Sequence, residues 1–460
     1  AELDKWWSKT LELIEGHRAR APDDTESELP TIREWISQNI DEARTLQSQY
    51  HQEAQFLYPV TIGTESQVIS FADNGGIKAL LDNLDSLARD SDRPIIVAVV
   101  GASSSGKSIT RENILQQRPQ WAAFSTDDYS KGLQYGQSQM HRYGGKFNFD
   151  VPDQYELELV SAHLAELKNN RPIQRPVFHF KPGEREGYET FEPAPVILVE
   201  GLFASMVAQD ADLTVFIDAD THGLLLRRLI RDKDRTIFSS SETFRMFTET
   251  VWPGYKEYVE PARDNIQTIL INNYDAQKES LNIKETECLM RADSSLVNED
   301  ALLQLGAARK SSYSQKEIYL AAPGKDLDAH DELVCIRVID GKDYSFVYEG
   351  PRYGKDKLQR PVFAFSVDED AVELLKSIGY RVISTVESRY ATFELDNLEV
   401  QIVDMQGIGR SLEVNFNQRT YVAKAKDLLR KLGIEHFDSR SHLELSREVS
   451  EIATLRENLN

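Results

Sequence analysis

The spacing of hydrophobic residues changes character twice along this chain. In residues 1–90 the apolar side chains recur at intervals of three and four, which predicts amphipathic helices. Between residues 92 and 275, short apolar runs such as 95–100 and 196–200 alternate with helical patterns, which predicts a parallel α/β sheet. After about residue 280, short β-branched and aromatic segments are separated by turn residues, which predicts an antiparallel meander closing toward a barrel.

These three patterns predict an organisation in four parts. We expect an N-terminal helical region at 1–91, an α/β domain at 92–278, an antiparallel β-barrel domain of α+β class at 279–440, and a C-terminal amphipathic helix at 441–460. A chain of 460 residues is too long for one ordinary hydrophobic core, which agrees with two or three domains. In the α/β part, functional groups belong at the carboxyl ends of the parallel strands.

A phosphate-binding loop follows the first strand of the α/β part. Residues 101–108 read G-A-S-S-S-G-K-S, which is the spacing G-x-x-x-x-G-K-[ST] between an apolar strand and a helical pattern. Glycines let successive backbone N–H groups face a polyphosphate, and the helix N-terminus adds partial positive charge. Lys107 would reach the β- and γ-phosphates, and the Ser108 hydroxyl would bind magnesium. A chance match in a Gly/Ser-rich turn is the alternative, but the preceding buried strand argues against it. The nucleotide-binding residues predicted from the loop are Gly101, Ser103, Ser104, Ser105, Gly106, Lys107, Ser108 and Ile109.

Acidic and basic residues stand where they could complete a phosphoryl-transfer site. Asp127 follows the second strand and could accept a proton or hold magnesium, although a helix N-cap is the simpler role for an aspartate there. Glu200 ends another apolar strand and would complete the magnesium shell directly or through water. Arg228 and Arg231 lie one helical turn apart, which suits a clamp on a phosphoryl group, or alternatively a solvated basic face.

Composition narrows the classes of partner. The formal net charge of −22 argues against nucleic acid or an anionic membrane surface as the main partner. No apolar run approaches the length of a membrane span, and the N-terminus lacks the apolar core of a signal peptide. Cys288 and Cys335 give no disulfide framework, and the nine scattered histidines give no zinc pattern. We therefore expect a cytoplasmic protein.

The order of several segments resembles the uridine kinase and phosphoribulokinase family. Residues 148–153 (N-F-D-V-P-D), 175–180 (R-P-V-F-H-F), Glu200-Gly201 and 227–232 (R-R-L-I-R-D) follow the phosphate loop in the order found in that family. The resemblance implies a P-loop kinase fold, with Asp127 as catalytic base and with Lys107 and Ser108 on ATP phosphate and magnesium. It also implies that Arg228 and Arg231 are the helix arginines before a lid, with Arg235 as a lid residue on the nucleotide.

The same resemblance places the phosphate acceptor. Uridine kinases carry a tyrosine in P-V-Y-D-F and a histidine shortly after it, whereas this chain has Phe178 and His179, with Asp150 as the third expected residue of the acceptor pocket. A site built to hydrogen-bond its substrate loses discrimination when one partner changes. The sequence therefore predicts phosphoryl transfer to a nucleoside- or sugar-like hydroxyl without specifying uridine.

Charged residues alternate with apolar ones in the second half of the chain. Glu317, Arg337, Arg389, Asp404 and Glu413 stand at strand positions, and a period of two sends such residues to one face. If the sheet closes, that face becomes a tunnel in which acids could bind magnesium or manganese and arginines a polyphosphate. The alternative is an open sheet with a solvated polar face.

The second half also resembles the CYTH, or triphosphate tunnel, domain. The segments E-I-Y-L-x-x-P-G (317–324), C-I-R (335–337), Y-E-G-P-R (348–352) and G-x-G-R-S-L-E-V-N (407–415) carry this resemblance. A kinase-like domain followed by this barrel is similar to the plant triphosphate tunnel metalloenzymes with a fused kinase domain. By the resemblance, the family's opening E-x-E-x-K reads Glu317-Ile-Tyr319-Leu-Ala321, and its closing E-x-E reads Glu413-Val-Asn415. Two of four acids remain, which implies a degenerate tunnel that senses or positions a phosphorylated ligand.

Three hypotheses about function remain open at this point. The first is a Mg²⁺-dependent (or Mn²⁺-dependent) phosphotransferase that moves the γ-phosphate of ATP or GTP to a small hydroxyl acceptor. The second is hydrolysis of pyrophosphate or tripolyphosphate, which the plant relatives imply. The third is nucleotide-gated regulation without turnover. The partners expected are a nucleotide and a small phosphorylatable or polyphosphate substrate, with no nucleic acid and no membrane; the N-terminal helices are candidates for a homo-oligomer contact.

Overall fold

The computed structural model describes residues 67–70, 75–179, 181, 183–208, 211–266, 268–293 and 299–458. The chain divides into two compact units between Tyr274 and Asp275, a few residues before the expected boundary at 278. The helices predicted in residues 1–66, and the oligomer contact assigned to them, lie outside the described residues. No helix in the described part of the chain is long and apolar enough to cross a membrane.

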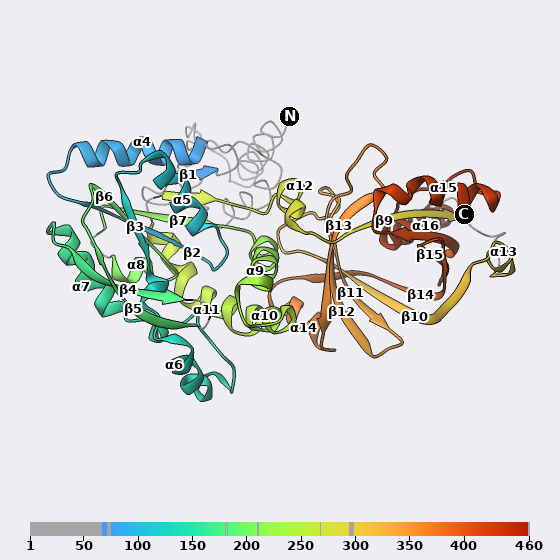
Figure 1. Ribbon diagram of the computed structural model, residues 1–460, viewed down its shortest axis with the longest axis horizontal. Coiled ribbons are helices and arrows are strands. Elements are labelled where there is room, and N and C mark those ends of the chain that lie inside the picture. Colours follow the sequence, from blue (N-terminus) through green and yellow to red (C-terminus); the bar gives the residue numbers. More distant parts are fainter. Residues whose placement is uncertain are drawn as a thin grey trace, which may run out of the picture. The chain divides into compact units, whose positions relative to one another are not determined.

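The first unit is built on a six-stranded sheet in which neighbouring strands run parallel. Its order is β1-β8-β7-β2-β6-β3, and the strands other than β8 are labelled in Figure 1. The strands are β1 Gln67–Ser70, β2 Ile95–Gly101, β3 Ala122–Ser125, β6 Val196–Glu200, β7 Leu213–Asp218 and β8 Thr268–Ile271. All residues of β2 and β6 are buried, because a parallel sheet is covered on both faces. The predicted parallel α/β sheet is confirmed.

Helices cover both faces of this sheet. The apolar side of α4 Gly75–Arg89 and one residue of α5 Lys107–Gln117 share a buried cluster with alternate residues of β2, β6 and β7. The helices α7 Leu157–Lys168 and α8 Ala204–Val207 also pack on β2. The remaining helical elements of this unit are η1 Thr126–Tyr129, α6 Gly132–Gln139, η2 Met140–Tyr143, η3 Pro152–Gln154, α9 Thr221–Arg235, α10 Ser240–Met246, η4 Phe247–Val251, α11 Trp252–Gly254, η5 Tyr255–Val259 and η6 Glu260–Asn265.

A separate antiparallel hairpin, which the sequence did not predict, stands beside the carboxyl end of β3. It consists of β4 Ile173–His179 and β5 Glu184–Phe191. Arg175 of β4 pairs with Asp128 of η1 at 3.0 Å, and its guanidinium lies 5.7 Å from the centre of the Phe191 ring. These contacts join the hairpin to η1, the element that also carries Asp127.

The second unit is a closed antiparallel barrel, which confirms the predicted barrel over an open sheet. Its order is β10-β11-β12-β13-β9-β16-β15-β14, and β14 closes it by pairing with β10. The strands are β9 Thr286–Asp293, β10 Ala308–Ala321, β11 Leu333–Ile339, β12 Asp343–Glu349, β13 Gln359–Val367, β14 Arg381–Leu395, β15 Leu398–Met405 and β16 Gly409–Phe416. Closure leaves each strand with one face toward the interior and one face outward.

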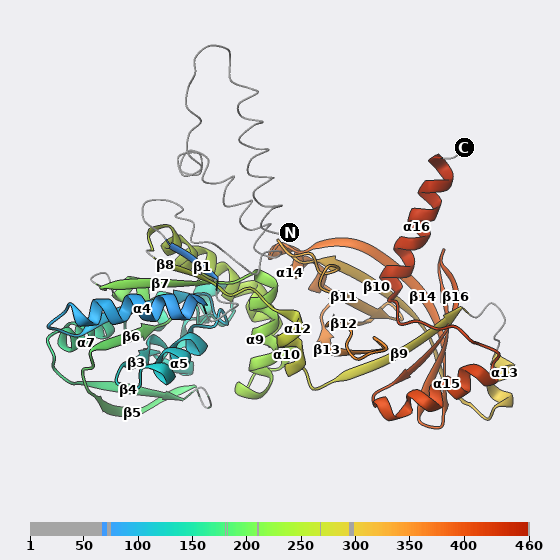
Figure 2. The same ribbon diagram turned by 90° about the horizontal axis from the view of Figure 1, so that it is seen from above.

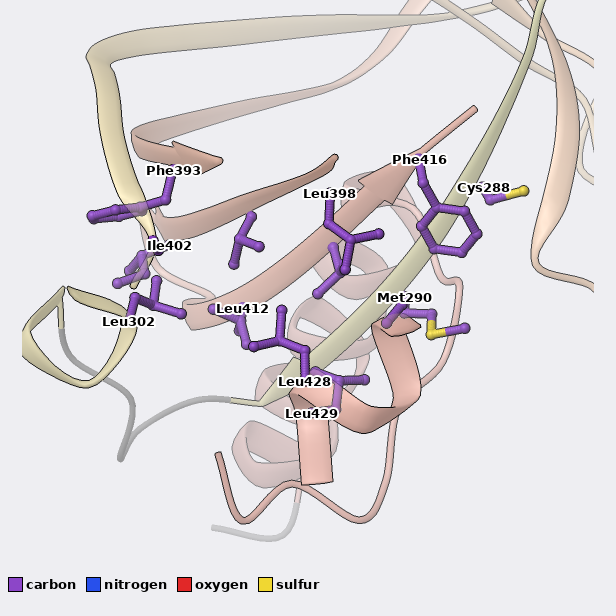
Figure 3. Close-up of a cluster of buried hydrophobic side chains, with 14 of the residues drawn as sticks. Cys288, Met290, Leu302, Phe393, Leu398, Ile402, Leu412, Phe416, Leu428 and Leu429 are labelled. Carbon is purple, nitrogen blue, oxygen red and sulfur yellow. The ribbon is translucent and has the colours of Figure 1, made fainter. Parts of the chain in front are cut away.

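An apolar layer covers part of the outside of the barrel (Figure 3). Met290 of β9, Ile402 of β15 and Leu412 of β16 belong to one buried cluster. Leu428 and Leu429 of α15 Val422–Lys431 belong to the same cluster. The short helix α13 Glu299–Gln304 adds Leu302 to this cluster. The other helical elements of the unit are α12 Ala276–Glu279, η7 Ser280–Asn282, α14 Ala371–Ser377, η8 Arg419–Tyr421 and α16 His442–Asn458.

The first turn of α16 belongs to the barrel. Leu443 is buried in a cluster with interior residues such as Tyr319 and Cys335, and Leu445 packs with Tyr390. Figure 2 shows the rest of α16 running outward from this point. The sequence placed a C-terminal helix at 441–460 as a part of its own. The packing of its first turn instead makes it an element of the barrel unit.

Candidate functional site

The predicted phosphate loop connects β2 to α5, and its glycines stand where no side chain would fit. A Cβ at Gly101 would lie 2.5 Å from the carbonyl oxygen of Ile217, and a Cβ at Gly106 would lie 2.4 Å from Asn272 Nδ2. Asn272, just after β8, donates a hydrogen bond to the Ser105 carbonyl at 2.7 Å. The ends of the neighbouring strands β7 and β8 therefore hold the loop in its tight conformation.

Other predicted loop residues lie around this turn. The hydroxyl groups of Ser104 and Ser105 are buried and have no hydrogen-bond partner within the described part of the chain. Ile109 lies in the first turn of α5 and is exposed. The Ser105 backbone N–H donates to the Ala102 carbonyl oxygen at 3.1 Å, and α5 begins two residues later, so the loop adjoins a helix N-terminus.

Lys107 is buried with its ammonium held at the loop. Its Nζ donates to the carbonyl oxygens of Gly101 at 2.9 Å and Ala102 at 2.7 Å. Burial lowers the pKa of Lys107, and the negative charges of Glu200 and Asp127 act against that shift. The negative charges of these two acids therefore both act on the one lysine of the loop.

Ser108 and Glu200 are in direct contact. The Ser108 hydroxyl donates to Glu200 Oε1 at 3.1 Å, and Arg111 NH1 lies 2.8 Å from the same oxygen. Burial raises the pKa of Glu200, while the charges of Lys107 and Arg111 act against this. The sequence reasoning missed Arg111. Its position three residues after Ser108, on the same face of α5, was the available signal.

Asp127 lies in η1 and is not the residue that caps it. Ser125 is the N-cap, and its hydroxyl accepts a hydrogen bond from the Asp127 backbone N–H at 3.2 Å. The simpler N-cap role that the sequence left open for Asp127 is therefore wrong. Its neighbour Asp128 is engaged by Arg175.

The helix α9 brings its arginines toward the loop. Arg228 NH1 donates to Ser103 Oγ at 2.8 Å and lies 3.9 Å from Asp150 Oδ2. Arg231 pairs with Asp232 at 2.6 Å, and its charge contributes to the lowered pKa of Lys107. Arg228 is a buried residue, so the solvated basic face proposed as an alternative does not apply to it.

Arg235, the predicted lid residue, ends α9. Desolvation and the Arg231 charge lower its pKa, and the charges of Asp127 and Glu200 act in the other direction. The charges of these two acids thus reach both Lys107 and Arg235.

The three residues predicted for the acceptor differ in burial. Asp150 is buried, its pKa is raised by burial, and its Oδ2 lacks a hydrogen-bond partner in the described region. His179 is instead exposed on β4, where its Nε2 lies 2.7 Å from Glu186 Oε2. Phe178 precedes it and is half-buried. His179 thus faces solvent and its hairpin partner, and its role beside Asp150 in the acceptor pocket stays a prediction.

The barrel interior contains two of the predicted tunnel acids. Glu317 of β10 and Glu413 of β16 are both buried, and His442 from the start of α16 lies between them. Its Nδ1 is 2.6 Å from Glu317 Oε2, and its Nε2 is 2.9 Å from Glu413 Oε1. Burial favours a neutral ring, but the two carboxylates outweigh it and raise the pKa of His442 to about 9. Nothing in the sequence around His442 signalled this role.

Arginine and hydroxyl groups complete the environment of the two acids. Glu413 accepts from Arg291 Nε at 2.9 Å, and Glu317 accepts from Arg337 NH2 at 3.3 Å and from the Tyr319 hydroxyl at 3.1 Å. Burial alone would raise both carboxyl pKa values. His442 with Arg337 lowers that of Glu317, and Arg291 with His442 lowers that of Glu413, each to about 2.

Two predicted tunnel residues lie on the wrong face. Arg389 and Asp404 are exposed and face each other in register on the outside of β14 and β15, and Asp404 pairs with Arg410 at 2.8 Å. Because neighbouring residues of a strand point to opposite faces, it is Tyr390 that lies inside. Arg389 and Asp404 are therefore excluded from the interior.

Further charged residues face the interior beyond the predicted set. Arg360 of β13 pairs with Glu349 of β12 at 2.6 Å and stands opposite Glu287 of β9. Burial and the Glu349 charge raise the pKa of Glu287, while the charges of Arg337 and Arg360 act against this. The interior thus contains paired acids and bases beside its apolar clusters.

The interior cluster predicts a pH-dependent stability of the barrel. The pKa of His442 is about 9 in the folded chain and about 6.5 when unfolded, so its stabilising contribution is present below about pH 6.5 and lost as the pH rises through 9. The groups facing it, Glu317, Glu413, Arg291 and Arg337, keep their charges over this range. We expect urea unfolding to show a loss on the order of 3 kcal/mol between pH 6 and 10. A stability that is flat over this range would contradict the bridging imidazolium.

Each of the two units matches a known protein family or domain. Residues 96–276, which include the loop, Glu200 and the arginines of α9, match the phosphoribulokinase / uridine kinase family. Uridine kinase of Chloroflexus aggregans is 32% identical over 176 residues, covering 37% of this chain and 83% of that enzyme. The chain belongs to the phosphoribulokinase / uridine kinase family. Beyond this kinase-family domain, residues 284–448 match the CYTH domain.

Some relatives align with both units of this kinase-family chain. Inorganic pyrophosphatase TTM1 of Arabidopsis thaliana is 25% identical over 398 residues, which are 84% of this chain and 59% of that protein. Uridine-cytidine kinase C of Dictyostelium discoideum is 23% identical over 366 residues, which are 77% of this chain and 78% of that protein. The chain spans 59% and 56% of the lengths of the Arabidopsis TTM1 and TTM2 proteins that it matches.

The CYTH match also moves the opening motif of the tunnel. The match begins at residue 284, so its first strand is β9, whereas the sequence reasoning placed E-x-E-x-K on β10. The interior positions of β9 are Glu287, Leu289 and Arg291, as their pairing with Arg360, Asn415 and Glu413 shows. On β9 the motif E-x-E-x-K reads E-C-L-M-R over residues 287–291. One of its two acids remains, and arginine replaces the lysine. The assignment of the motif to residues 317–321 is therefore corrected.

Proposed function

We propose that the first unit is a Mg²⁺-dependent phosphotransferase that moves the γ-phosphate of ATP or GTP to a small nucleoside- or sugar-like hydroxyl. The observation that carries this proposal is the set of contacts around the phosphate loop. Lys107, the Ser108–Glu200 pair and Arg228 all contact the loop or its first helical turn. Glycine-rich loops of this kind cradle polyphosphates, and phosphoryl transfer needs mainly positioning and charge stabilisation.

The residues around the loop then have the following tasks in the transfer. Asp127 accepts the proton of the acceptor hydroxyl, whose oxygen forms the new bond to the γ-phosphorus. The bond from that phosphorus to the bridging oxygen breaks, and the nucleoside diphosphate leaves with the electron pair. Lys107, Arg228 and Arg231 stabilise the charge on the transferring group. Asp150 Oδ2, which is buried, 3.9 Å from Arg228 and without a hydrogen-bond partner in the described region, would accept a hydrogen bond from the acceptor.

Magnesium has suitable donors in the same unit. The Ser108 hydroxyl and the Glu200 carboxylate are hard oxygen donors already in contact with each other, and the charge of Asp127 reaches the same lysine as that of Glu200. When bound, magnesium would supply neutralisation of the negative charge on the phosphate groups. Ser108, Glu200 and Asp127 are the residues that would hold it. Manganese has the same ligand preference.

We propose in addition that the barrel interior binds a polyphosphate or nucleotide phosphate chain. Arg291 NH1 and Arg337 Nε are buried N–H groups without a hydrogen-bond partner in the described part of the chain. Guanidinium groups recognise phosphate oxygens through such N–H pairs. The CYTH match and the interior position of both arginines support this assignment.

Hydrolysis of pyrophosphate or tripolyphosphate is the second candidate. It is favoured by one observation, the alignment of 84% of this chain with a protein named inorganic pyrophosphatase. It needs no organic acceptor. Nucleotide-gated regulation without turnover is the third candidate.

Phosphorus NMR distinguishes these functions in one experiment. The full chain is incubated with Mg²⁺ and ATP or GTP in a mixed nucleoside and sugar pool, and separately with pyrophosphate and tripolyphosphate. A new phosphomonoester signal that disappears in Asp127→Asn is the expected result. Orthophosphate from the inorganic substrates without any phosphomonoester would replace the kinase proposal by the hydrolase. Nucleotide binding without a new signal in either arm would support the regulatory function.

Arg111→Ala is expected to lower the Mg²⁺ concentration needed for half-maximal activity. Arg111 occupies the Glu200 oxygen that Ser108 also contacts, so its removal frees that carboxylate for the metal. We expect a decrease of about threefold to tenfold, which corresponds to roughly 1 kcal/mol for one exchanged charge-assisted contact. Arg171→Ala, on an exposed residue after α7, is the matched control. An unchanged or increased Mg²⁺ requirement would contradict a competing role for Arg111.

A further inference from the structure

The two predicted tunnel acids already hold a cation that belongs to the chain. The side chains of His442, Glu317 and Glu413 are each only 5–6% exposed. Ionised carboxylates accept hydrogen bonds but do not donate them, so both ring nitrogens of His442 must carry protons. The ring is therefore an imidazolium, and neither nitrogen has a lone pair for a metal ion.

The carboxylate oxygens around this ring are largely occupied. Glu317 receives His442, Tyr319 and Arg337, and Glu413 receives His442, Arg291 and Ser411. Three cations face two carboxylates, which opposes the entry of a further cation. Among the described residues, no group of three or more His, Cys, Asp or Glu side chains is arranged to hold a metal ion. The divalent cation that the sequence expected in the tunnel does not fit these residues.

Packing fixes the position of the imidazole. Leu443 is buried beside Tyr319 and Cys335, and Glu444 pairs with Arg352 at 2.9 Å. The Ser441 hydroxyl accepts from the Glu444 backbone N–H, and the Glu444 carboxylate accepts from the Ser441 backbone N–H, so the helix start is capped in both directions. The start of α16 is thus held on both sides of His442.

We propose that the imidazolium of His442 takes the place of a divalent cation between Glu317 and Glu413, so that the barrel binds no divalent cation there while α16 is seated. The first turn of α16 is then a built-in stopper of that position. In this state the interior offers guanidinium groups alone to a phosphate ligand, without metal. The inference concerns only cation binding and holds whichever reaction the first unit catalyses.

Mn²⁺ titration of the full chain, followed by the electron paramagnetic resonance signal of free Mn²⁺, tests the proposal. Wild type and His442→Lys, which keeps a cation at this position, should bind the same number of ions. His442→Ala should bind one more, and the added Glu317→Gln change should remove that extra site. Any Mn²⁺ bound by the first unit is common to all four proteins and cancels in the comparison. A site already present in wild type and lost in Glu317→Gln would overturn the proposal, as would a folded His442→Ala protein without an added site.

Nitrogen NMR of the wild-type histidine rings makes the test independent of whether His442→Ala folds. The spectrum should contain one ring, absent from His442→Lys, with both nitrogens protonated near neutral pH and unchanged by excess Mg²⁺. A deprotonated nitrogen in that ring, or a shift of its resonances on addition of Mg²⁺, would refute the imidazolium stopper. Unchanged ring signals together with the Mn²⁺ results above would support it.

Discussion

Replacing Lys107 by alanine is expected to lower kcat/KM for phosphoryl transfer by about 10³-fold, in line with the loss of one charge-stabilising donor at a transition state. The reason is the position of its ammonium, which is buried at the loop and held by the carbonyl oxygens of Gly101 and Ala102. Steady-state kinetics with the acceptor identified by phosphorus NMR measure the change.

The fold should tolerate this substitution, which separates a catalytic role from a structural one. The glycines and Asn272 keep the loop conformation, so the thermal unfolding of Lys107→Ala should change little. Lys78→Ala, on the exposed side of α4, is the matched control and should keep full activity. Undiminished turnover in Lys107→Ala would exclude phosphoryl transfer at this loop.

Replacing His442 by alanine is expected to destabilise the barrel by about 3 kcal/mol, the lower end of the range for breaking a buried charged network. The substitution removes two charge-assisted hydrogen bonds and leaves Glu317 and Glu413 buried. The lower end applies because Arg337 and Arg291 still compensate one acid each. Urea unfolding followed by circular dichroism measures the loss.

The chain contains an internal control for this measurement. All five tryptophans, at positions 6, 7, 35, 121 and 252, precede the barrel unit. Tryptophan fluorescence therefore reports the first part of the chain, and its transition should not move in His442→Ala. His436→Ala, on an exposed histidine of the segment before α16, should leave both transitions in place. A barrel transition equal to that of wild type would mean that the imidazole contributes no net stability.

Local sequence was sufficient for several elements of the first unit. The apolar run of β2, the glycine spacing of the loop and the acid at the end of β6 are contiguous signals, and they predicted the strand, the turn and the place of Glu200. The parallel arrangement followed because strand–helix–strand repeats have few alternatives. The hairpin of β4 and β5 was missed, because it interrupts this repeat and belongs to another sheet.

The barrel shows why the prediction of side-chain contacts failed where that of strands succeeded. The alternation of charged and apolar residues predicted that the charged residues would share one face of the sheet. A shift of one residue in register decides which face that is. In the structure Arg389 and Asp404 lie outside the barrel, while Tyr390 lies inside. The family match then moved the opening motif from β10 to β9, where Arg291 is the interior base.

The sequence alone was therefore enough to establish the phosphate loop, the two fold classes and the family resemblances, because each depends on residues close together in the chain. The contacts of Arg111 with Glu200, of Arg228 with Ser103, and of His442 with both barrel acids join residues 29 to 125 positions apart. Such contacts arise only when the sheet is ordered and the barrel is closed. No local pattern encodes them, because the free energy that selects them comes from burying each charge beside its partner.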